Sequence, residues 1–295
     1  MSKVSIIIPA RNEKYLQKTI EDIFAKATGE IEIIVGMNGR TDFPIRPVEE
    51  DITGRLKVHY EENPIDLKVM INKLVSKASG KYIYKSDAHC MFAEGFDEVL
   101  QADMQEDWVV TPRFFVLDAE KWQVQDLRFY DYFYLHCPLT DPKGLRFKAG
   151  GHWPEKTQEM LAKMIDETPS MHGSGWFVSK DYYQNVLIGF PEVDNMGHAQ
   201  EPIWLGLKNY LMGGKLMVNK KTWYAHLHQD SNQRGYGTSN QHTEQTYKWT
   251  AEYWLSNTWP DRIHDFEWFV DKFMPMPGWP EDWKEKYEQY LKLHS

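Results

Sequence analysis

The sequence predicts an α/β fold in which an open, mostly parallel sheet is flanked by helices. Short apolar runs rich in β-branched residues, typical of strands buried on both faces, alternate with segments of helical spacing along the first third of the chain. Such alternation requires crossover connections, which place the strands parallel. Sheets of this kind bind ligands beyond the carboxyl ends of their strands, and polar residues follow each run here. We therefore expect the functional site at that edge.

The first strand–helix–strand unit is expected over residues 4 to 38. Val4–Ala10 is a near-continuous apolar run, and Ile31–Asn38 is a second one. Between them, Tyr15–Lys26 has its apolar residues at helical spacing. These apolar residues are Leu16, Ile20, Ile23 and Phe24. Gly29 follows as the stop signal for that helix.

A second unit follows with the same pattern. We expect a strand from Leu56 to Asn63 and a helix from Asp66 to Ser79, followed by a short strand that runs into Asp87. Four polar residues then fall at strand ends that share one edge of the sheet. They are Arg11, Asn38, Asn63 and Asp87.

The triplet Asp87-Ala88-His89 is the strongest candidate for a metal site. On an extended segment alternate side chains share a face, so Asp87 and His89 point the same way. One carboxylate with one imidazole suits Mn²⁺ or a similar borderline cation, whereas a site built only of oxygens favours Mg²⁺ or Ca²⁺. An isolated Asp-x-His triplet is more often a turn cap beside a hydrogen-bonded histidine. The polar residues at the neighbouring strand ends favour the metal interpretation here.

The middle of the chain predicts further strands around the same edge. Two strands that form a hairpin are expected at Trp108–Val116 and Trp122–Leu127. Their aromatic residues either cover the core or form a platform on which the ring of a ligand could stack. Residues 150–154 form a glycine-containing loop that could close over a ligand bound at this edge of the sheet. Met171–Tyr183 predicts a loop, a strand and a helix start, and a helix is expected from Pro202 to a stop at Gly213.

Composition limits the class of protein. The 295 residues are 42% hydrophobic and 26% charged, which is ordinary for a soluble globular protein. A formal charge of −9 argues against a general polyanion binder. Two cysteines provide no disulfide framework, and no apolar stretch approaches membrane-spanning length. We expect a soluble, cytoplasmic protein.

Several segments together resemble a known enzyme family. In order and spacing, these segments resemble the nucleotide-binding half of family-two-type GT-A glycosyltransferases. They are VSIIIPARNE, IEIIVGMNGRTD, Asn63, Asn72, the stretch 78–83 and Asp87-x-His89. The Asp-Ala-His-Cys form of the motif is most similar to the polypeptide N-acetylgalactosaminyltransferases. The resemblance implies a GT-A (Rossmann-like) fold and transfer of a sugar from a nucleotide-sugar donor, a UDP-sugar in those relatives. It also points to retention of the anomeric configuration.

The resemblance implies a donor nucleotide site on residues after the first strands and on the second helix. These residues are Pro9, Arg11, Glu13, Asn38, Arg40, Asp42, Asn63, Lys68, Asn72 and Ser86. Arg11, Arg40 and Lys68 are candidate auxiliary cations. The family usually has an acidic residue near Met37-Asn38 that contacts the base, and this chain has none there. Asp42 could substitute for it, which leaves the identity of the base open.

The resemblance also implies a donor-sugar and acceptor side of the site. Its candidate lining residues are Ser174, Gly175, Trp176, His198 and Trp153. Glu201 falls where related enzymes keep an acidic residue near the sugar, and with Asp87 it is the candidate catalytic residue. A plain alternative is that Glu201 only satisfies the N-terminus of the following helix. Pro202 replaces the second acidic residue of many inverting relatives, which weakens the case for a general base at this place.

A third metal ligand is expected at the end of the strand Lys215–Asp230. His226 and His228 lie two residues apart and face one side of that strand. The resemblance implies that a histidine from this position joins Asp87 and His89, and alignment on the preceding Trp-Tyr-Ala favours His226, with His228 in reserve. The expected cofactor is Mn²⁺, or another divalent cation such as Mg²⁺.

We therefore predict a metal-dependent glycosyltransferase with a hydroxyl acceptor. The acceptor stays open between a saccharide and a hydroxylated DNA base, the latter as in soluble phage-type DNA glycosyltransferases. The alternative class is a nucleotidyltransferase of similar fold. It is disfavoured because no glycine-rich phosphate loop bearing Lys or Arg follows the first strand.

Domain boundaries follow the change in composition. Residues 1–235 are expected to form the catalytic domain, with a nucleotide-binding half at 1–92 and an acceptor half at 93–235. Residues 236–295 are expected to form a helical extension dense in Trp, Tyr and Phe. Its aromatic residues could pack on the catalytic domain or on a second subunit, which would make the protein a homo-oligomer.

Overall fold

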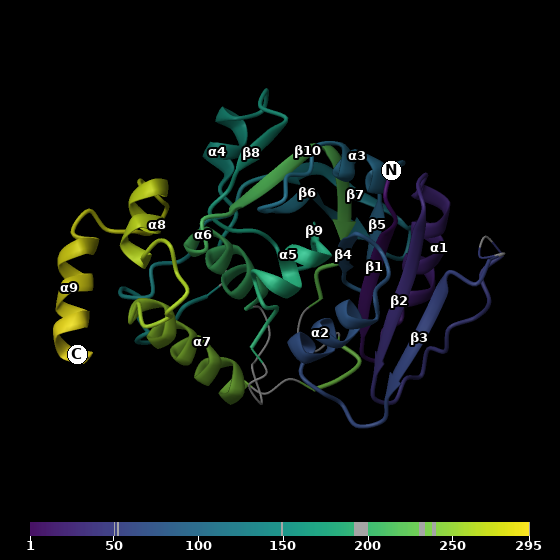
Figure 1. The fold of residues 1–295 in the computed structure, drawn as a ribbon, viewed down its shortest axis with the longest axis horizontal. Helices are drawn as coiled ribbons and strands as arrows, with labels where there is room; N and C mark the ends of the chain where they lie inside the picture. The colour runs from purple at the N-terminus through teal and green to yellow at the C-terminus, as the bar shows by residue number, and fades with distance from the viewer. Residues whose placement is uncertain are drawn as a thin grey trace.

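A computed structural model describes residues 1–49, 51, 53–148, 150–191, 200–229, 234–237 and 240–294. A mixed sheet lies at its centre, with helices on both faces (Figure 1). The strands are β1 (Val4–Ala10), β2 (Ile31–Asn38), β3 (Leu56–Glu61), β4 (Tyr82–Ser86), β5 (Cys90–Phe92), β6 (Trp108–Asp118), β7 (Gln123–Tyr130), β8 (Ile165–Glu167), β9 (Gly175–Ser179) and β10 (Lys215–His226). The α-helices are α1 (Leu16–Lys26), α2 (Leu67–Lys77), α3 (Phe96–Ala102), α4 (Pro154–Glu159), α5 (Lys180–Asn185), α6 (Lys208–Leu211), α7 (Asn240–Leu255), α8 (Phe266–Phe273) and α9 (Trp283–His294). A π-helical segment, η1 (Pro202–Leu207), runs directly into α6.

The predicted parallel arrangement holds in one half of the sheet. The strand order is β3-β2-β1-β4-β9-β6-β10-β5, with β7 on β6 and β8 on β10. The strands β3, β2, β1 and β4 are parallel, as the sequence predicts. The other half is mixed: β6 and β10 are parallel, whereas β9 is antiparallel to β4 and β6, and β5 is antiparallel to β10. Strands that enter from loops or hairpins need no crossover helix, so antiparallel pairing is open to them.

Both faces of the central strands are buried, which explains their continuous apolar runs. Side chains of β1 alternate between two cores: Ile6 and Ile8 lie in the core with α1, and Ile7 lies in the core with α2. Helix α1 contributes Ile20 to the first core, and α2 contributes Leu74 to the second. The sheet is thus a middle layer between two layers of helix.

Short-range signals set the limits of α2 and of the strand before it. Asp66 caps α2, because its side chain accepts a hydrogen bond from the backbone N–H of Lys68 at 2.9 Å. The preceding strand, β3, ends at Glu61 rather than at the predicted Asn63. Asn63 lies in an exposed bend beyond the strand.

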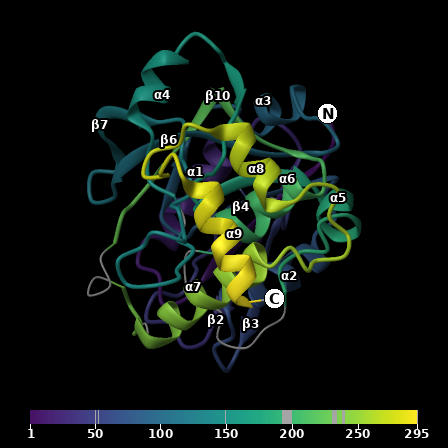
Figure 2. The same ribbon diagram turned by 90° about the vertical axis from the view of Figure 1, so that its left-hand side faces the viewer.

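The C-terminal helices are packed onto the rest of the molecule. Figure 2 shows α8 and α9 in front of the sheet, with α7 below them. Trp254 of α7, Phe266 of α8 and Trp279, which lies between α8 and α9, are buried in the same core as Leu74 of α2. The Trp279 indole N–H also donates to the Leu135 carbonyl at 2.6 Å. In the described part of the chain, no helix combines the length and apolar character needed to cross a membrane.

Candidate active site

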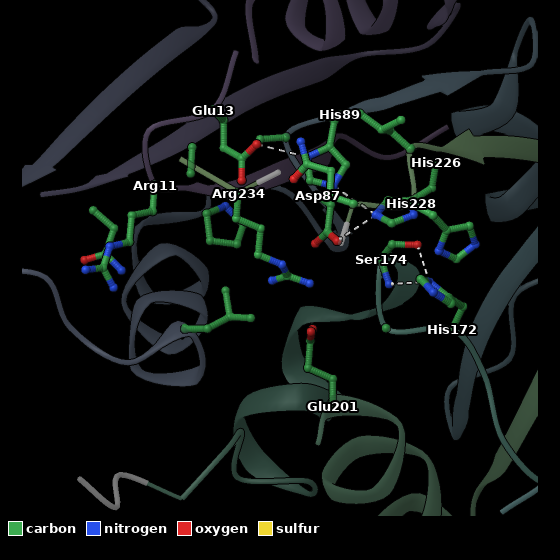
Figure 3. Close-up of a pocket in the computed structure, with 18 of the residues that line it drawn as sticks. Arg11, Glu13, Asp87, His89, His172, Ser174, Glu201, His226, His228 and Arg234 are labelled. Atoms are coloured by element: carbon green, nitrogen blue, oxygen red, sulfur yellow. Dashed lines mark hydrogen bonds and ion pairs between the residues drawn. The ribbon is translucent and has the colours of Figure 1, made fainter. Parts of the chain in front are cut away.

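A pocket of about 360 Å³ opens at the carboxyl ends of β1, β2 and β4. Figure 3 shows Asp87 near its middle, with Arg11 on one side, several histidines on the other, and Glu201 across from it. The pocket is lined by Pro9, Ala10, Arg11, Glu13, Asn38, Ile65, Leu67, Asp87, Ala88, His89, Gly150, Met171, His172, Gly173, Ser174, Glu201, Pro202, His226, Leu227, His228, Gln229, Arg234 and Tyr236. Its position agrees with the edge expected for ligands in such sheets.

Strand pairing brings Asp87, His89 and His226 together. Where β4 ends, the backbone N–H of Asp87 donates to the Ser174 carbonyl at 2.9 Å. The chain then turns into β5, whose first residue Cys90 pairs with His226. As a result His226 Nε2 lies 3.2 Å from Asp87 Oδ2 and 3.0 Å from His89 Nε2.

The hydrogen-bond network assigns the protons of these histidines. His89 Nδ1 lies 3.1 Å from a Glu13 carboxylate oxygen, so it carries a proton and leaves Nε2 with a lone pair. Nε2 of His226 then donates to Asp87 and His89. Nδ1 of His226 is buried and has no hydrogen-bond partner among the described residues. Burial lowers the pKa of His226 to about 3, although the Asp87 hydrogen bond raises it, so the ring is neutral at pH 7.

These residues fit a divalent cation. One carboxylate and two imidazoles make the mixed oxygen–nitrogen set that borderline metals accept. Glu13 holds the His89 ring by its Nδ1, as carboxylates do for metal-binding histidines. His226 would present Nε2 to a cation only after its proton moves to Nδ1.

A buried lysine connects Asp87 to Glu201. Lys85 Nζ lies 2.6 Å from Asp87 Oδ1, 3.1 Å from Glu201 Oε1 and 2.8 Å from the Gly173 carbonyl. The Trp176 indole N–H also donates to Glu201, at 3.1 Å. Because Lys85 is fully buried, its three acceptors satisfy all three N–H bonds of the ammonium group. Lys85 thus holds Asp87 Oδ1, and Oδ2 is the oxygen of Asp87 that faces His226 and would face a cation.

Burial and charge act in opposite directions on these groups. Burial raises the pKa of Asp87, but Lys85 and His226 outweigh it and hold that pKa well below its usual range. Burial lowers the pKa of Lys85, but Asp87 and Glu201 reverse the effect and raise it. Burial raises the pKa of Glu201, with Asp87 adding to the rise and Lys85 opposing it. Lys85 and Asp87 are therefore charged at neutral pH.

Positive charge also lies at the opposite side of the pocket. The Arg11 guanidinium lies over the Tyr236 ring, 4.8 Å from its centroid. Arg234 lines the same pocket, and its Nη1 lies 3.5 Å from the Tyr236 hydroxyl. Segments far apart in the sequence thus place two cations where an anionic ligand could bind.

The structure gathers about half of the predicted site residues in this pocket. They are Pro9, Arg11, Glu13, Asn38, Asp87, His89, Ser174, Glu201, His226 and His228. Asn38 has a structural role as well, because its amide exchanges two hydrogen bonds of 2.8 Å with the backbone of Ile65.

Other predicted donor-nucleotide residues do not line the pocket. Arg40, Asp42 and Asn63 are exposed in loops beyond β2 and β3. Asn72 holds α2 to the loop after α5, since its amide bonds both the N–H and the carbonyl of Phe190. Lys68 is buried beside Asp66, at 3.7 Å.

Of the residues predicted for the sugar side of the site, Ser174 lines the pocket, whereas Gly175, Trp176 and Trp153 do not. Gly175 and Trp176 are buried beneath the pocket in β9, where an added Cβ on Gly175 would meet the Tyr224 ring at 2.9 Å. Ser86, which was predicted for the donor nucleotide, is buried too, and its hydroxyl donates to the Asp87 carbonyl. Trp153 precedes α4 and packs against Tyr134, outside the pocket. His198 lies outside the described residues.

Sequence reasoning missed four residues of the site: Lys85, His172, Arg234 and Tyr236. Lys85 could have been predicted from the sequence, because strand alternation places it on the same face as Asp87 and because a lysine is unusual inside an apolar strand. The other three reach the pocket through loops, and no spacing rule connects them to Asp87.

Comparison with family models decides the class of the protein. The model described as glycosyl transferase family 2 matches residues 5–187, which is more than half of the chain. The chain belongs to glycosyl transferase family 2. The match to a family of glycosyltransferases argues against the alternative of a nucleotidyltransferase. No curated protein matches the glycosyltransferase in sequence.

Solved structures show the same fold. The glycosyltransferase is similar to the structure of GalNAc-T7 with UDP, GalNAc and Mn²⁺, with a TM-score of 0.65 and 15% identity over 99% of this chain and 54% of that one. It is also similar to S. aureus TarS 1–349 in complex with UDP-GlcNAc, with a TM-score of 0.55 and 12% identity over 88% and 68% of the two chains. The chain spans about half the length of the GalNAc-T7 structure. These likenesses confirm the predicted GT-A fold.

Proposed function

We propose that this glycosyltransferase moves a sugar from a UDP-sugar to a hydroxyl acceptor, with a divalent cation held by Asp87, His89 and His226. The observation that carries the proposal is the meeting of these three side chains in the pocket at the carboxyl ends of β1, β2 and β4. The structures of similar fold were solved with UDP and Mn²⁺ or with UDP-GlcNAc, which supports the same class of donor here.

The proposed roles follow from charge and position. A divalent cation at Asp87, His89 and His226 would neutralise the departing nucleoside diphosphate. Arg11 and Arg234 line the pocket with further positive charge for the same group. Pro9 and Asn38 line it near Ile65, and we assign the nucleoside to that side.

The carboxylate of Glu201 is buried and held by hydrogen bonds, as expected for a group that positions a ligand. Lys85 and Trp176 donate to it from below, and it is only 5% exposed. Gly173 lets it approach closely, since an added Cβ there would lie 3.2 Å from Glu201 Oε2. We propose that Glu201 orients a hydroxyl of the donor sugar or of the acceptor and that it does not act as a general base, which agrees with retention of configuration.

A donor screen tests this proposal. Hydrolysis of a panel of nucleotide sugars should require Mn²⁺ or Mg²⁺ and should be fastest with a UDP-sugar. Asp87→Asn and His89→Gln should each lower the rate by about 100-fold or more, because each removes a ligand of the cation. His59→Gln is the matched control, since His59 lies in β3 and does not line the pocket.

Two results would contradict the proposal. One is metal-independent hydrolysis at the same rate, and the other is unchanged turnover in both ligand variants. Proton NMR of the transferred sugar would test retention separately, because it reports the anomeric configuration of the product directly.

A further inference from the structure

A second set of histidines lies beside the proposed metal site and shares one residue with it. His172, His226 and His228 each offer a nitrogen within 4.8 Å of the others. Their ring centroids form a nearly regular triangle, with separations of 5.1, 5.4 and 5.4 Å. His172 comes from the loop before β9, His226 is the last residue of β10, and His228 follows it by two residues (Figure 3). Phe114 stacks on His172 and forms an apolar floor for the cluster.

The nitrogen atoms of His226 are divided between the two sets. Nε2 contacts Asp87 and His89. Nδ1 is buried without a hydrogen-bond partner in the described part of the chain, on a residue that is only 6% exposed. A buried nitrogen of this kind lacks the partner that native structures nearly always supply. A cation held with His172 and His228 would supply it.

We propose that His172, His226 and His228 form a second cation site for a nitrogen-preferring metal such as Zn²⁺, and that this site and the Asp87–His89–His226 site are occupied alternately. A neutral imidazole has one lone-pair nitrogen, because its other nitrogen carries the proton, so His226 can bind only one cation at a time. Three imidazoles without a carboxylate favour Zn²⁺, Ni²⁺ or Cu²⁺ over Mn²⁺. The inference rests on the proposed function, in which the other site holds the activating cation.

The existing hydrogen bonds of His226 suit the second site, and His172 needs a change of tautomer to join it. With a cation on Nδ1, the Nε2–H of His226 donates to Asp87 Oδ2, as metal-bound histidines commonly donate to a carboxylate. His172 Nδ1 accepts a hydrogen bond from the backbone N–H of Ser174 at 3.3 Å and lies 2.6 Å from the Ser174 hydroxyl oxygen, so Nε2 carries the ring proton. His172 would present Nε2 to a cation after this proton moves to Nδ1, which can then donate to the Ser174 hydroxyl oxygen. His228 is exposed, so a cation can enter from solvent. Zn²⁺ bound here would therefore withdraw His226 from the activating cation and inhibit transfer.

Cobalt absorption tests the site without nucleotide or turnover. The metal-free full chain is titrated with Co²⁺ alone, which absorbs strongly in the visible range when few, nitrogen-rich ligands surround it. We expect a strong band that Zn²⁺ displaces, that His228→Asn and His172→Phe abolish, and that His89→Gln retains. The exposed His228 and the retained ring stack in His172→Phe keep the fold, which circular dichroism checks. A strong band that survives both variants but disappears in His89→Gln would overturn the proposal, as would a wild-type chain without one.

Zinc inhibition supplies the second measurement. With Mn²⁺ and donor present, half-inhibition of His228→Asn should need at least about tenfold more Zn²⁺ than the wild type, each rate being normalised to the variant's own rate in Mn²⁺ alone. Equal zinc sensitivity would contradict alternate occupation. If no donor is turned over with any cation, the proposed function fails, and the cobalt spectra still decide whether the second site exists.

Discussion

At the scale of single residues, Lys85 holds a positive charge where no solvent reaches it. Its ammonium group lies between Asp87 and Glu201, and the three groups are joined by contacts of 2.6 to 3.3 Å. Two carboxylates this close would repel each other without a cation between them. Lys85 therefore makes it possible for Asp87 and Glu201, which we propose to face the cation and the sugar, to share one pocket.

Replacing this lysine should be costly. Lys85→Met leaves the buried carboxylates without their partner, so we expect the free energy of unfolding to fall by about 3 to 5 kcal/mol. Transfer should be lost as well, because Glu201 and Asp87 no longer have fixed positions. Urea denaturation and donor turnover measure the two effects.

Lys81→Met is the matched control for that change. Lys81 is exposed at the start of the same strand region, so its replacement should alter stability by no more than about 0.5 kcal/mol. Equal stabilities of the two variants would show that the buried ion pairs of Lys85 contribute nothing measurable.

At the scale of elements, Glu32 connects the parallel strands β1, β2 and β3. It lies in β2 and is only 1% exposed. Its carboxylate accepts hydrogen bonds from Ser5 of β1 at 2.6 Å, from the backbone of Ser79 at 2.7 Å and from Lys57 of β3 at 2.5 Å. One side chain thus joins three strands and the segment between α2 and β4.

This arrangement predicts a pH-dependent contribution to stability. Burial raises the pKa of Glu32, but the hydrogen bonds of Lys57, Ser5 and Ser79 outweigh it and lower that pKa to about 2. An unfolded chain has a glutamate pKa of about 4.3, so the stabilisation is complete above that pH and is lost as the pH falls through 2. Glu32→Gln should cost about 3 kcal/mol at pH 7 and about half as much at pH 3. Urea denaturation at both pH values measures this, and an equal cost at both would contradict the assignment.

The same scale shows how far sequence reasoning reaches. The strands β1 and β2 and helix α1 were predictable, because two-sided burial leaves continuous apolar runs and one-sided burial leaves helical spacing. Asp87, His89 and His226 were predictable as a set through the strand ends on which they lie. Asn72 was predicted to bind the nucleotide because of its position in the resembling segment. In the structure its amide joins α2 to Phe190 by two hydrogen bonds. His172 was beyond reach, since only tertiary packing places it near β10.

At the scale of the whole molecule, the C-terminal helices share a core with η1, the segment that directly follows Glu201. Trp254 of α7 packs on Trp204 of η1, with ring centroids 5.0 Å apart, and Trp204 follows Glu201 by three residues. The predicted boundary at residues 235 and 236 therefore separates segments that share one core (Figure 1).

Trp254→Ala tests whether the two segments unfold together. Deleting a large side chain that is 2% exposed should lower the free energy of unfolding by about 3 to 5 kcal/mol. We expect one cooperative transition, with far-UV circular dichroism and tryptophan fluorescence changing at the same urea concentration. Two separate transitions would show that residues 236–295 form an independent unit. Trp268→Ala is the control and should cost less, because Trp268 is only partly buried and stacks on His264.

The cation held by Asp87, His89 and His226 is the central claim about this glycosyltransferase, and calorimetric titration of UDP with and without Mn²⁺ tests it most directly. We predict that Mn²⁺ strengthens UDP binding to the wild-type chain by at least about tenfold and that His89→Gln removes most of this gain. The claim would be contradicted if UDP bound equally well without Mn²⁺, or if His89→Gln kept the full effect of the metal.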